Sequence, residues 1–98
     1  MLEEKIFAEG VAREIKSYLA PGFSDVECKA VEQKKNNSVI LVGVSFHRPG
    51  QQADPIVYME PFYDAIQQGK PRKQVMEGIA RLAEEGMEVR EIPEAYSI

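Results

Sequence analysis

The stretch Ser38-Val39-Ile40-Leu41-Val42-Gly43-Val44-Ser45-Phe46 is the most apolar run in the chain, and it decides the fold. It is rich in β-branched residues, and apolar residues occupy odd and even positions alike, which is typical of a strand buried on both faces. We therefore expect a central β-strand over residues 38–46. Gly43 within it predicts a bulge, or a close approach by a helix or a ligand.

A shorter strand is predicted on either side of this run. Residues 25–32 alternate between apolar and charged side chains, which is typical of a half-buried strand. The following segment, residues 34–37, ends in two asparagines and is a candidate hairpin turn, because Asn tolerates the left-handed region. Residues 47–55 are predicted to form a loop, and residues 56–59 a short third strand.

Three helices are predicted outside the strands. The first covers residues 2–19, the second residues 62–68 between Pro61 and Gly69, and the third residues 71–85, with Gly86 as its C-terminal cap. Apolar side chains repeat every three or four positions in the first and last of them. The expected core residues are Leu2, Ile6, Phe7, Val11, Ile15 and Tyr18 or Leu19 in the first helix, and Val75, Met76, Ile79, Leu82 and Ala83 in the last.

These elements predict an α+β fold with the order α-β-β-β-α-α. Short connections favour antiparallel pairing, so we expect a three-stranded antiparallel sheet with helices packed on one face. A length of 98 residues suits one domain. We place that domain at residues 1–86, followed by a loosely ordered tail or edge strand over residues 87–98.

Composition and charge exclude several classes of protein. With 44% apolar and 29% charged residues, the chain is unlike a disordered one. Its single cysteine excludes an intrachain disulfide and a cysteine-based zinc site. No apolar run reaches the roughly 18 residues that a membrane span needs, and the acidic N-terminus does not resemble a signal peptide. We therefore expect a cytoplasmic protein with no membrane partner. We also expect no cofactor, because the sequence holds no phosphate-binding or metal-binding motif.

Residues 39–69 resemble a known family. An apolar strand, a basic turn at residues 46–50 and the segment Tyr58-Met59-Glu60-Pro61-Phe62-Tyr63 follow one another in this stretch. The last segment is similar to an element of the pattern aromatic, apolar, Glu, Pro, aromatic, Tyr. That element belongs to a family of bacterial domains, common in gut anaerobes, that is known only as a domain of unknown function. The resemblance covers most of residues 3–85. It implies no activity, and it leaves open whether the chain is one domain of a longer protein.

One candidate site is aromatic and acidic. Tyr58, Glu60 and Tyr63 lie close together in the sequence, and His47 is the only histidine. Such a group could line a pocket or an interface, or Tyr58 could belong to the core with its hydroxyl at the surface. An enzymatic reading would need Tyr58, Glu60, His47 and Asp64 to share a cleft. We disfavour that reading and assign no catalytic residue, and we assign no metal ligand because the spacing of metal motifs is absent.

The second candidate is a basic patch where the last helix begins. Lys70, Arg72 and Lys73 oppose the helix dipole there, which favours a functional role for them, and Arg48 is a further candidate. The element order is similar to that of double-stranded-RNA-binding domains, which read duplex shape and phosphates. An extra helix and a net charge of −4, which equals the balance of residues 74–98, argue against that role.

The sheet itself leads to the function that we favour. A central strand that is apolar on both sides, in a sheet with helices on one face only, leaves apolar surface exposed. Such surface usually marks a contact with a partner. We therefore expect a non-catalytic protein-interaction domain that self-associates or binds a protein partner, with nucleic-acid binding as the alternative.

Overall fold

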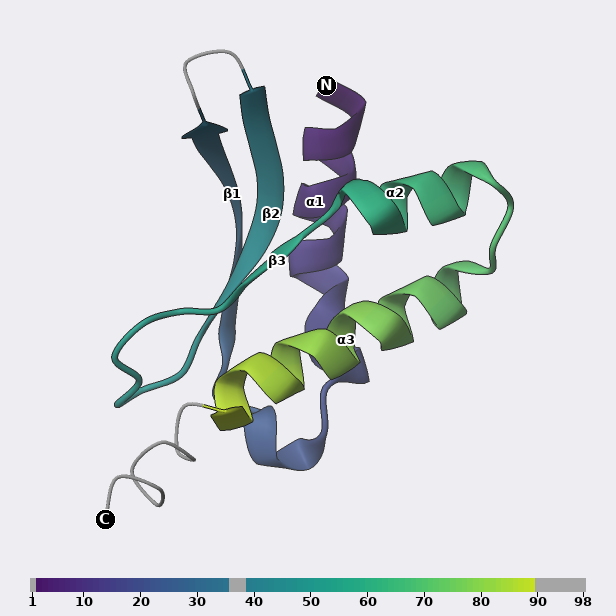
Figure 1. The fold of residues 1–98 in the computed structure, drawn as a ribbon. Helices are drawn as coiled ribbons and strands as arrows, with labels where there is room; N and C mark the ends of the chain where they lie inside the picture. Colours follow the sequence, from purple (N-terminus) through teal and green to yellow (C-terminus); the bar gives the residue numbers. More distant parts are fainter. Residues whose placement is uncertain (1, 36–38, 90–98) are drawn as a thin grey trace.

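The computed structural model of the chain describes residues 2–35 and 39–89 (Figure 1). The predicted α+β class and the order α-β-β-β-α-α are confirmed. Helix α1 continues into a 3-10 turn, η1, and a second 3-10 turn, η2, precedes the sheet. The elements are α1 (Leu2–Glu14), η1 (Ile15–Tyr18), η2 (Pro21–Phe23), β1 (Glu27–Lys35), β2 (Val39–His47), β3 (Ile56–Tyr58), α2 (Glu60–Gln67) and α3 (Arg72–Val89).

The three strands form an antiparallel sheet in the order β1-β2-β3, so the predicted central strand is indeed central. In this register Cys28 lies opposite Phe46, and Val44 lies opposite both Ala30 and Val57. Side chains that oppose one another across antiparallel strands share a face of the sheet. Figure 1 shows the helices gathered on one side of the sheet. The sheet residues buried on that side include Val42, Val44, Phe46 and Val57.

Helices α1 and α3 complete the core, with two corrections to the predicted core faces. Ala8 and Val11 of α1 and Ile15 of η1 are buried, but Ile6 of α1 is 64% exposed. Leu82 of α3 is 48% exposed. The buried arc of α3 is centred near Ala83, and Leu82 is turned about 100° away from that residue around the helix. The buried residues of α3 are Val75, Met76, Ile79, Ala80, Ala83 and Met87.

The C-terminal helix is longer than predicted. It passes through Gly86 and ends at Val89, so the predicted cap at Gly86 is wrong, and residues 87–89 belong to the helix rather than to a tail or an edge strand. Met87 is buried, which favours another turn of helix. A Cβ at Gly86 would lie 3.0 Å from Cβ of Pro55, so this glycine allows α3 to approach the loop before β3. Residues 90–98 lie outside the described residues, and the expected tail stays a prediction.

Other boundaries differ from the predictions by a few residues. Strand β1 extends to Lys35, three residues beyond its predicted end, and α2 begins at Glu60 rather than at Phe62. Gly69 ends α2 with a positive φ of 92°, as its position predicts. Of the predicted hairpin turn at residues 34–37, residues 34 and 35 belong to β1, and residues 36 and 37 lie outside the described residues. None of the described helices is both long and apolar enough to cross a bilayer.

Candidate functional site: the helix-free face of the sheet

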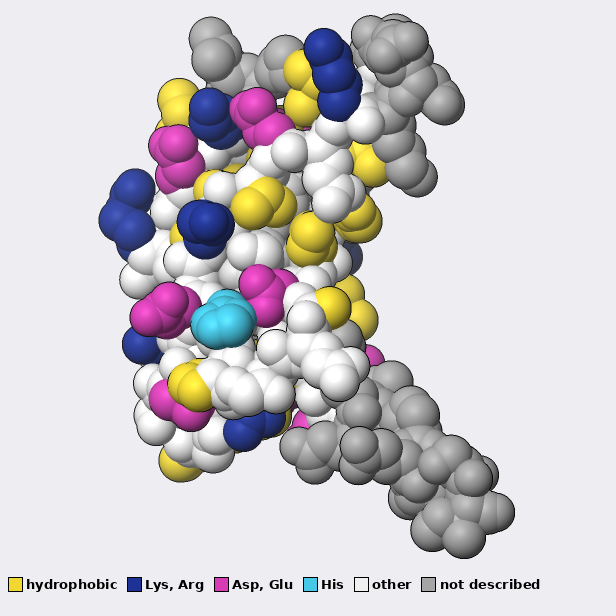
Figure 2. Space-filling view, turned by 90° about the vertical axis from the view of Figure 1, so that its left-hand side faces the viewer, with side chains coloured by type: hydrophobic (Ala, Val, Ile, Leu, Met, Phe, Trp, Pro, Cys, Tyr) yellow, Lys and Arg dark blue, Asp and Glu magenta, His cyan; other side chains and the backbone are white. Residues whose placement is uncertain are grey.

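The face of the sheet turned away from the helices carries a mixture of apolar and polar side chains. The strand register places odd-numbered residues of β1 and β2, with Ile56 and Tyr58 of β3, on this face. Figure 2 views the molecule from this side: the lone histidine appears in cyan, and hydrophobic side chains are interspersed with charged ones. We call this surface the open face. Its described apolar side chains are Val31, Val39, Leu41, Ile56 and Tyr58, each at least partly exposed.

Gly43 lies at the centre of the open face. It is paired with Val31 on one side and with Tyr58 on the other. A Cβ at this position would lie 2.7 Å from Cγ2 of Ile56 and 3.4 Å from Cδ1 of Tyr58. The close approach predicted at Gly43 is therefore made by strand β3, not by a helix or a ligand, and the register runs on without a bulge.

The missing side chain of Gly43 leaves room for Tyr58 to extend across β2. The Tyr58 hydroxyl donates a hydrogen bond to Oε1 of Gln33 on β1, two strands away. An aromatic ring laid over a glycine in this way covers exposed backbone and helps to fix the strand register. Tyr58 is still 38% exposed, so the ring is also available for contact with a partner.

At the end of β2, the open face meets the loop that leads to β3. His47 Nδ1 lies 2.9 Å from Oδ1 of Asp54. Gln51 Nε2 donates to the Phe46 carbonyl oxygen at 3.0 Å and to the same Asp54 oxygen at 3.3 Å. Ser45, two residues before His47 on the same face, donates its hydroxyl to the Lys29 carbonyl oxygen. The His47–Asp54 pair thus fastens the loop to the strand. The hydroxyl of Ser45 is directed to Lys29, so Ser45 is not placed as a nucleophile that His47 could activate.

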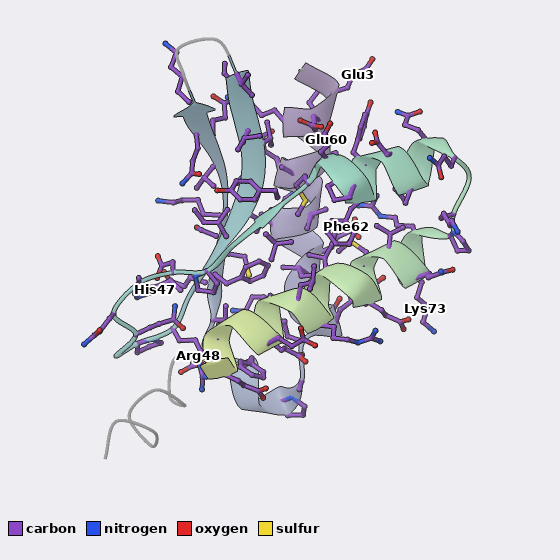
Figure 3. The ribbon with its side chains drawn as sticks, viewed as in Figure 1. Glu3, His47, Arg48, Glu60, Phe62 and Lys73 are labelled. Carbon is purple, nitrogen blue, oxygen red and sulfur yellow. The ribbon has the colours of Figure 1, made fainter. Side chains whose placement is uncertain are left out.

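The structure separates the four residues of the aromatic and acidic candidate. Tyr58 and His47 lie on the open face, whereas Glu60 begins α2, and Figure 3 shows Glu60 well apart from His47. Tyr63 faces α1: its ring lies 5.7 Å from that of Phe7. These residues do not share a cleft, so the arrangement that an enzymatic reading requires is not formed.

The hydroxyl of Tyr63 links α2 to α1. It donates a hydrogen bond of 2.8 Å to Glu3 Oε1. This bond to a carboxylate raises the pKa of Tyr63, desolvation adds to the increase, and a bond with Gln67 opposes it. Pattern reasoning did not anticipate this contact, because the two residues are 60 positions apart in sequence.

The basic candidates are divided between two places and partly engaged. Arg72 makes two hydrogen bonds to the Glu14 carboxylate, at 3.2 and 3.0 Å. The Arg48 guanidinium lies 4.7 Å from the centre of the Phe23 ring. Figure 3 places Arg48 and Lys73 at opposite ends of α3. The structure therefore leaves Arg48 apart from the start of α3, where Arg72 and Lys73 lie.

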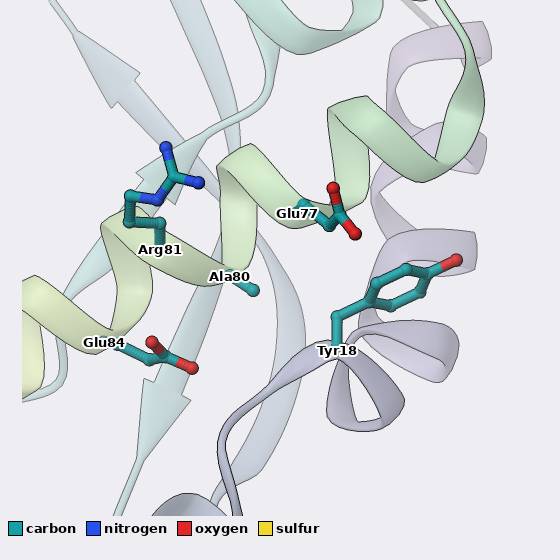
Figure 4. Close-up of a pocket in the computed structure, with 5 residues that line it drawn as sticks. All are labelled: Tyr18, Glu77, Ala80, Arg81 and Glu84. Carbon is teal, nitrogen blue, oxygen red and sulfur yellow. The ribbon is translucent and has the colours of Figure 1, made fainter.

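A shallow pocket of about 370 Å³ lies between η1 and α3, at residues that the sequence did not indicate as a site (Figure 4). Exposed polar positions on an amphipathic helix carry no signal of their own, which is why they were missed. Glu84 Oε2 accepts a hydrogen bond of 2.8 Å from the Ala20 N–H, so this carboxylate helps to hold the chain after η1. In Figure 4, the Arg81 guanidinium points away from the Tyr18 ring. The lining residues are Tyr18, Glu77, Ala80, Arg81 and Glu84.

Metal binding and cysteine-based catalysis have little support in the described part of the chain. Within residues 2–35 and 39–89, no three His, Cys, Asp or Glu side chains are grouped so that they could hold a metal ion. Cys28 is half-buried on the helix side of the sheet. Burial raises the pKa of its thiol, and the positive charge of Lys16 opposes that effect. A thiol that is protonated at neutral pH is a poor nucleophile.

Residues 4–96 match a family described as "Family of unknown function (DUF5688)". No curated protein and no solved structure matches the chain. The match covers the entire described fold except its first residues.

Proposed function

This chain belongs to the Family of unknown function (DUF5688), which assigns it no activity, and we propose that it is a non-catalytic domain that binds a protein partner through the open face. The observation that carries this proposal is the one-sided arrangement of the helices. All described helices pack on one side of the sheet, and the other side carries Val31, Leu41, Ile56 and Tyr58 at least partly exposed.

The composition of the open face suits a protein partner better than a small-molecule ligand. Its apolar centre is bordered by charged and polar side chains, among them Glu27, Lys29 and His47. An apolar centre with a polar rim is the usual anatomy of a protein interface, and Tyr is enriched in such centres. Each Å² of apolar surface that a partner covers contributes about 25 cal/mol, before the costs of association.

The test begins with capture of partners from native cells by the full chain. Each captured protein is then purified and titrated into the ¹⁵N-labelled chain. We expect amide shifts on β1, β2 and β3 that centre on Gly43. The variant Leu41→Glu should weaken binding at least tenfold, because it puts a charge at the centre of the contact.

The matched control is Leu82→Glu. Leu82 is a leucine that is 48% exposed, but it lies on α3, so this variant should bind like the wild type. Circular dichroism checks that both variants are folded. The proposal is wrong if the shifts map to α2 or α3, or if Leu41→Glu binds as well as Leu82→Glu.

Nucleic-acid binding has weaker support as an alternative. Arg72 and Arg48 already make contacts within the chain, with Glu14 and Phe23 respectively. Lys70 and Lys73 alone give a small phosphate-binding surface, and affinity for a polyanion grows with the number of phosphates contacted. Titration with short duplex RNA at low salt would reveal such binding as shifts over residues 70–76.

A further inference from the structure

Strand β1 forms one edge of the sheet, and its hydrogen-bonding groups can be assigned from the register. The Phe46 N–H donates to the Pro55 carbonyl oxygen, and the Met59 N–H donates to the Val42 carbonyl oxygen. Even-numbered residues of β2 therefore direct their backbone groups toward β3. Directions alternate along a strand, so odd-numbered residues of β2 are directed toward β1.

The same alternation applies to β1. Its odd-numbered residues pair with odd-numbered residues of β2, as Val31 does with Gly43. The backbone N–H and C=O groups of Cys28, Ala30, Glu32 and Lys34 therefore point away from the sheet. No strand of the described residues pairs with this edge. A nine-residue edge with a regular row of free donors and acceptors is a template for another strand.

We propose that the strand that completes this edge is β1 of a second copy of the chain, paired antiparallel about a twofold axis at Val31. The two sheets would then join into one continuous sheet of six strands. In this register all four outward-directed residues of each β1 find a hydrogen-bonding partner: Ala30 pairs with Glu32 of the other copy, and Cys28 pairs with Lys34.

The charges of β1 are compatible with this register and disfavour three others. With the axis at Val31, Lys29 lies opposite the neutral Gln33, and no like charges are opposed among the described side chains. An axis at residue 29, 32 or 34 would set an identical charge against itself, which destabilises a strand pair. Glu32 also has a positive partner within its own chain, since its carboxylate lies 3.5 Å from Nζ of Lys5.

The proposed pairing also connects with the open face. Val31 is half-buried and lies on that face, directly opposite Gly43. Two copies of Val31 would meet at the axis and make one apolar strip from the two open faces. The inference extends the proposed interaction role but uses a different surface, so either can fail without the other.

The first experiment measures the mass of the full chain in solution by sedimentation equilibrium over a range of concentrations. We expect a reversible dimer. Ala30→Pro should raise the dissociation constant of the dimer at least tenfold. Proline removes an outward N–H of β1 and leaves the hydrogen bonds to β2 in place. Ala30→Ser, which keeps the N–H, is the matched control and should dimerise. A chain that stays monomeric, or a folded Ala30→Pro dimer as tight as the wild type, would overturn the proposal.

The second experiment fixes the register in a Cys28→Ser background. Directly opposed residues in a non-hydrogen-bonded pair have Cα atoms about 4.5 Å apart, which suits a disulfide. Val31→Cys should therefore crosslink rapidly on mild oxidation. Lys29→Cys and Gln33→Cys should crosslink slowly, because each would lie about four residues from its own copy along the partner strand. Faster crosslinking at residue 29 or 33 would show that the axis is not at Val31.

The two proposals have distinct signatures. Leu41→Glu should weaken binding of a protein partner and leave the dimer intact. Ala30→Pro should weaken the dimer at least tenfold whether or not a partner binds the open face. If the chain dimerises but Leu41→Glu has no effect on any partner, the proposed function fails and the dimer stands.

Discussion

Replacement of Gly43 by alanine tests how the open face is built. A Cβ at this position would lie 2.7 Å from Cγ2 of Ile56, 3.1 Å from the Val57 carbonyl oxygen and 3.4 Å from Cδ1 of Tyr58. Favourable carbon–carbon contacts lie at about 3.5–4.0 Å. Ile56 would therefore have to move by about 1 Å, whereas the Val57 oxygen is held by the sheet.

The expected loss of stability follows from two opposing effects. Extra atoms forced into a packed site cost about 1–3 kcal/mol. Alanine also lowers the conformational entropy of the unfolded chain, which stabilises the folded state by about 0.4–1 kcal/mol. The net loss should be about 1–2 kcal/mol, a substantial part of the roughly 5–15 kcal/mol expected for a chain of this size. Displacement of the Tyr58 ring should also weaken its hydrogen bond to Gln33.

Urea denaturation followed by circular dichroism measures this change, and Gly78→Ala is the matched control. A Cβ at Gly78 would lie 3.5 Å from Cε1 of Phe62, an ordinary contact. Because Gly78 is inside α3, alanine should stabilise the helix by about 1 kcal/mol. The same chemical change should therefore have opposite effects at the two positions.

The reasoning is refuted if Gly43→Ala is as stable as the wild type or more stable. Ile56→Ala gives a second check, because it removes the methyl group that clashes most. The Gly43→Ala/Ile56→Ala double variant should be more stable than the sum of the two single changes predicts. Strict additivity would show that Ile56 is not the source of the cost.

Two further predictions concern the core and its cysteine. Ile79→Ala should destabilise the chain by about 2–5 kcal/mol, because Ile79 is fully buried. Leu82→Ala on the same helix should cost less than about 1 kcal/mol, because Leu82 is exposed. Equal unfolding midpoints of the two variants in urea would contradict the assigned core face of α3. The raised pKa of Cys28 means that the folded state holds the thiol proton more tightly than the unfolded state does. Its contribution to stability is therefore complete below the unfolded pKa, near 9, and is lost as the pH rises through the folded value. The free energy of unfolding, measured at pH 8 and at pH 10, should decrease more for the wild type than for Cys28→Ala. Identical decreases would show that the pKa of Cys28 is not raised by folding.

Much of the fold could be predicted because the decisive signals are local. The apolar run at residues 38–46 predicts a strand with neighbours on both sides, and its two flanking strands follow from alternation and turn residues. Errors occurred where burial depends on neighbours. Leu82 has the spacing of a core residue, yet it lies outside the arc of α3 that faces the sheet and η1. Met87 follows a glycine that could have ended the helix, yet it is buried.

The candidate sites were harder to predict, because closeness in sequence was used in place of closeness in space. Tyr58 and Tyr63 are five residues apart, but α2 begins between them. Tyr58 therefore lies on the open face, and Tyr63 contacts α1. Arg72 looked free at the start of a helix, and it is paired with Glu14 from 58 residues earlier. Only chain packing reveals such contacts.

The sequence by itself determined the class, the order of the elements and the central position of β2, because hydrophobic periodicity and turn chemistry act over a few residues. The tertiary structure decided which face of the sheet the helices cover. It also decided that Tyr58 extends over Gly43, and which backbone groups of β1 point outward. These features depend on the register between strands and on the side from which α1 and α3 pack. Register and side arise from contacts between residues far apart in the chain, which no local pattern encodes.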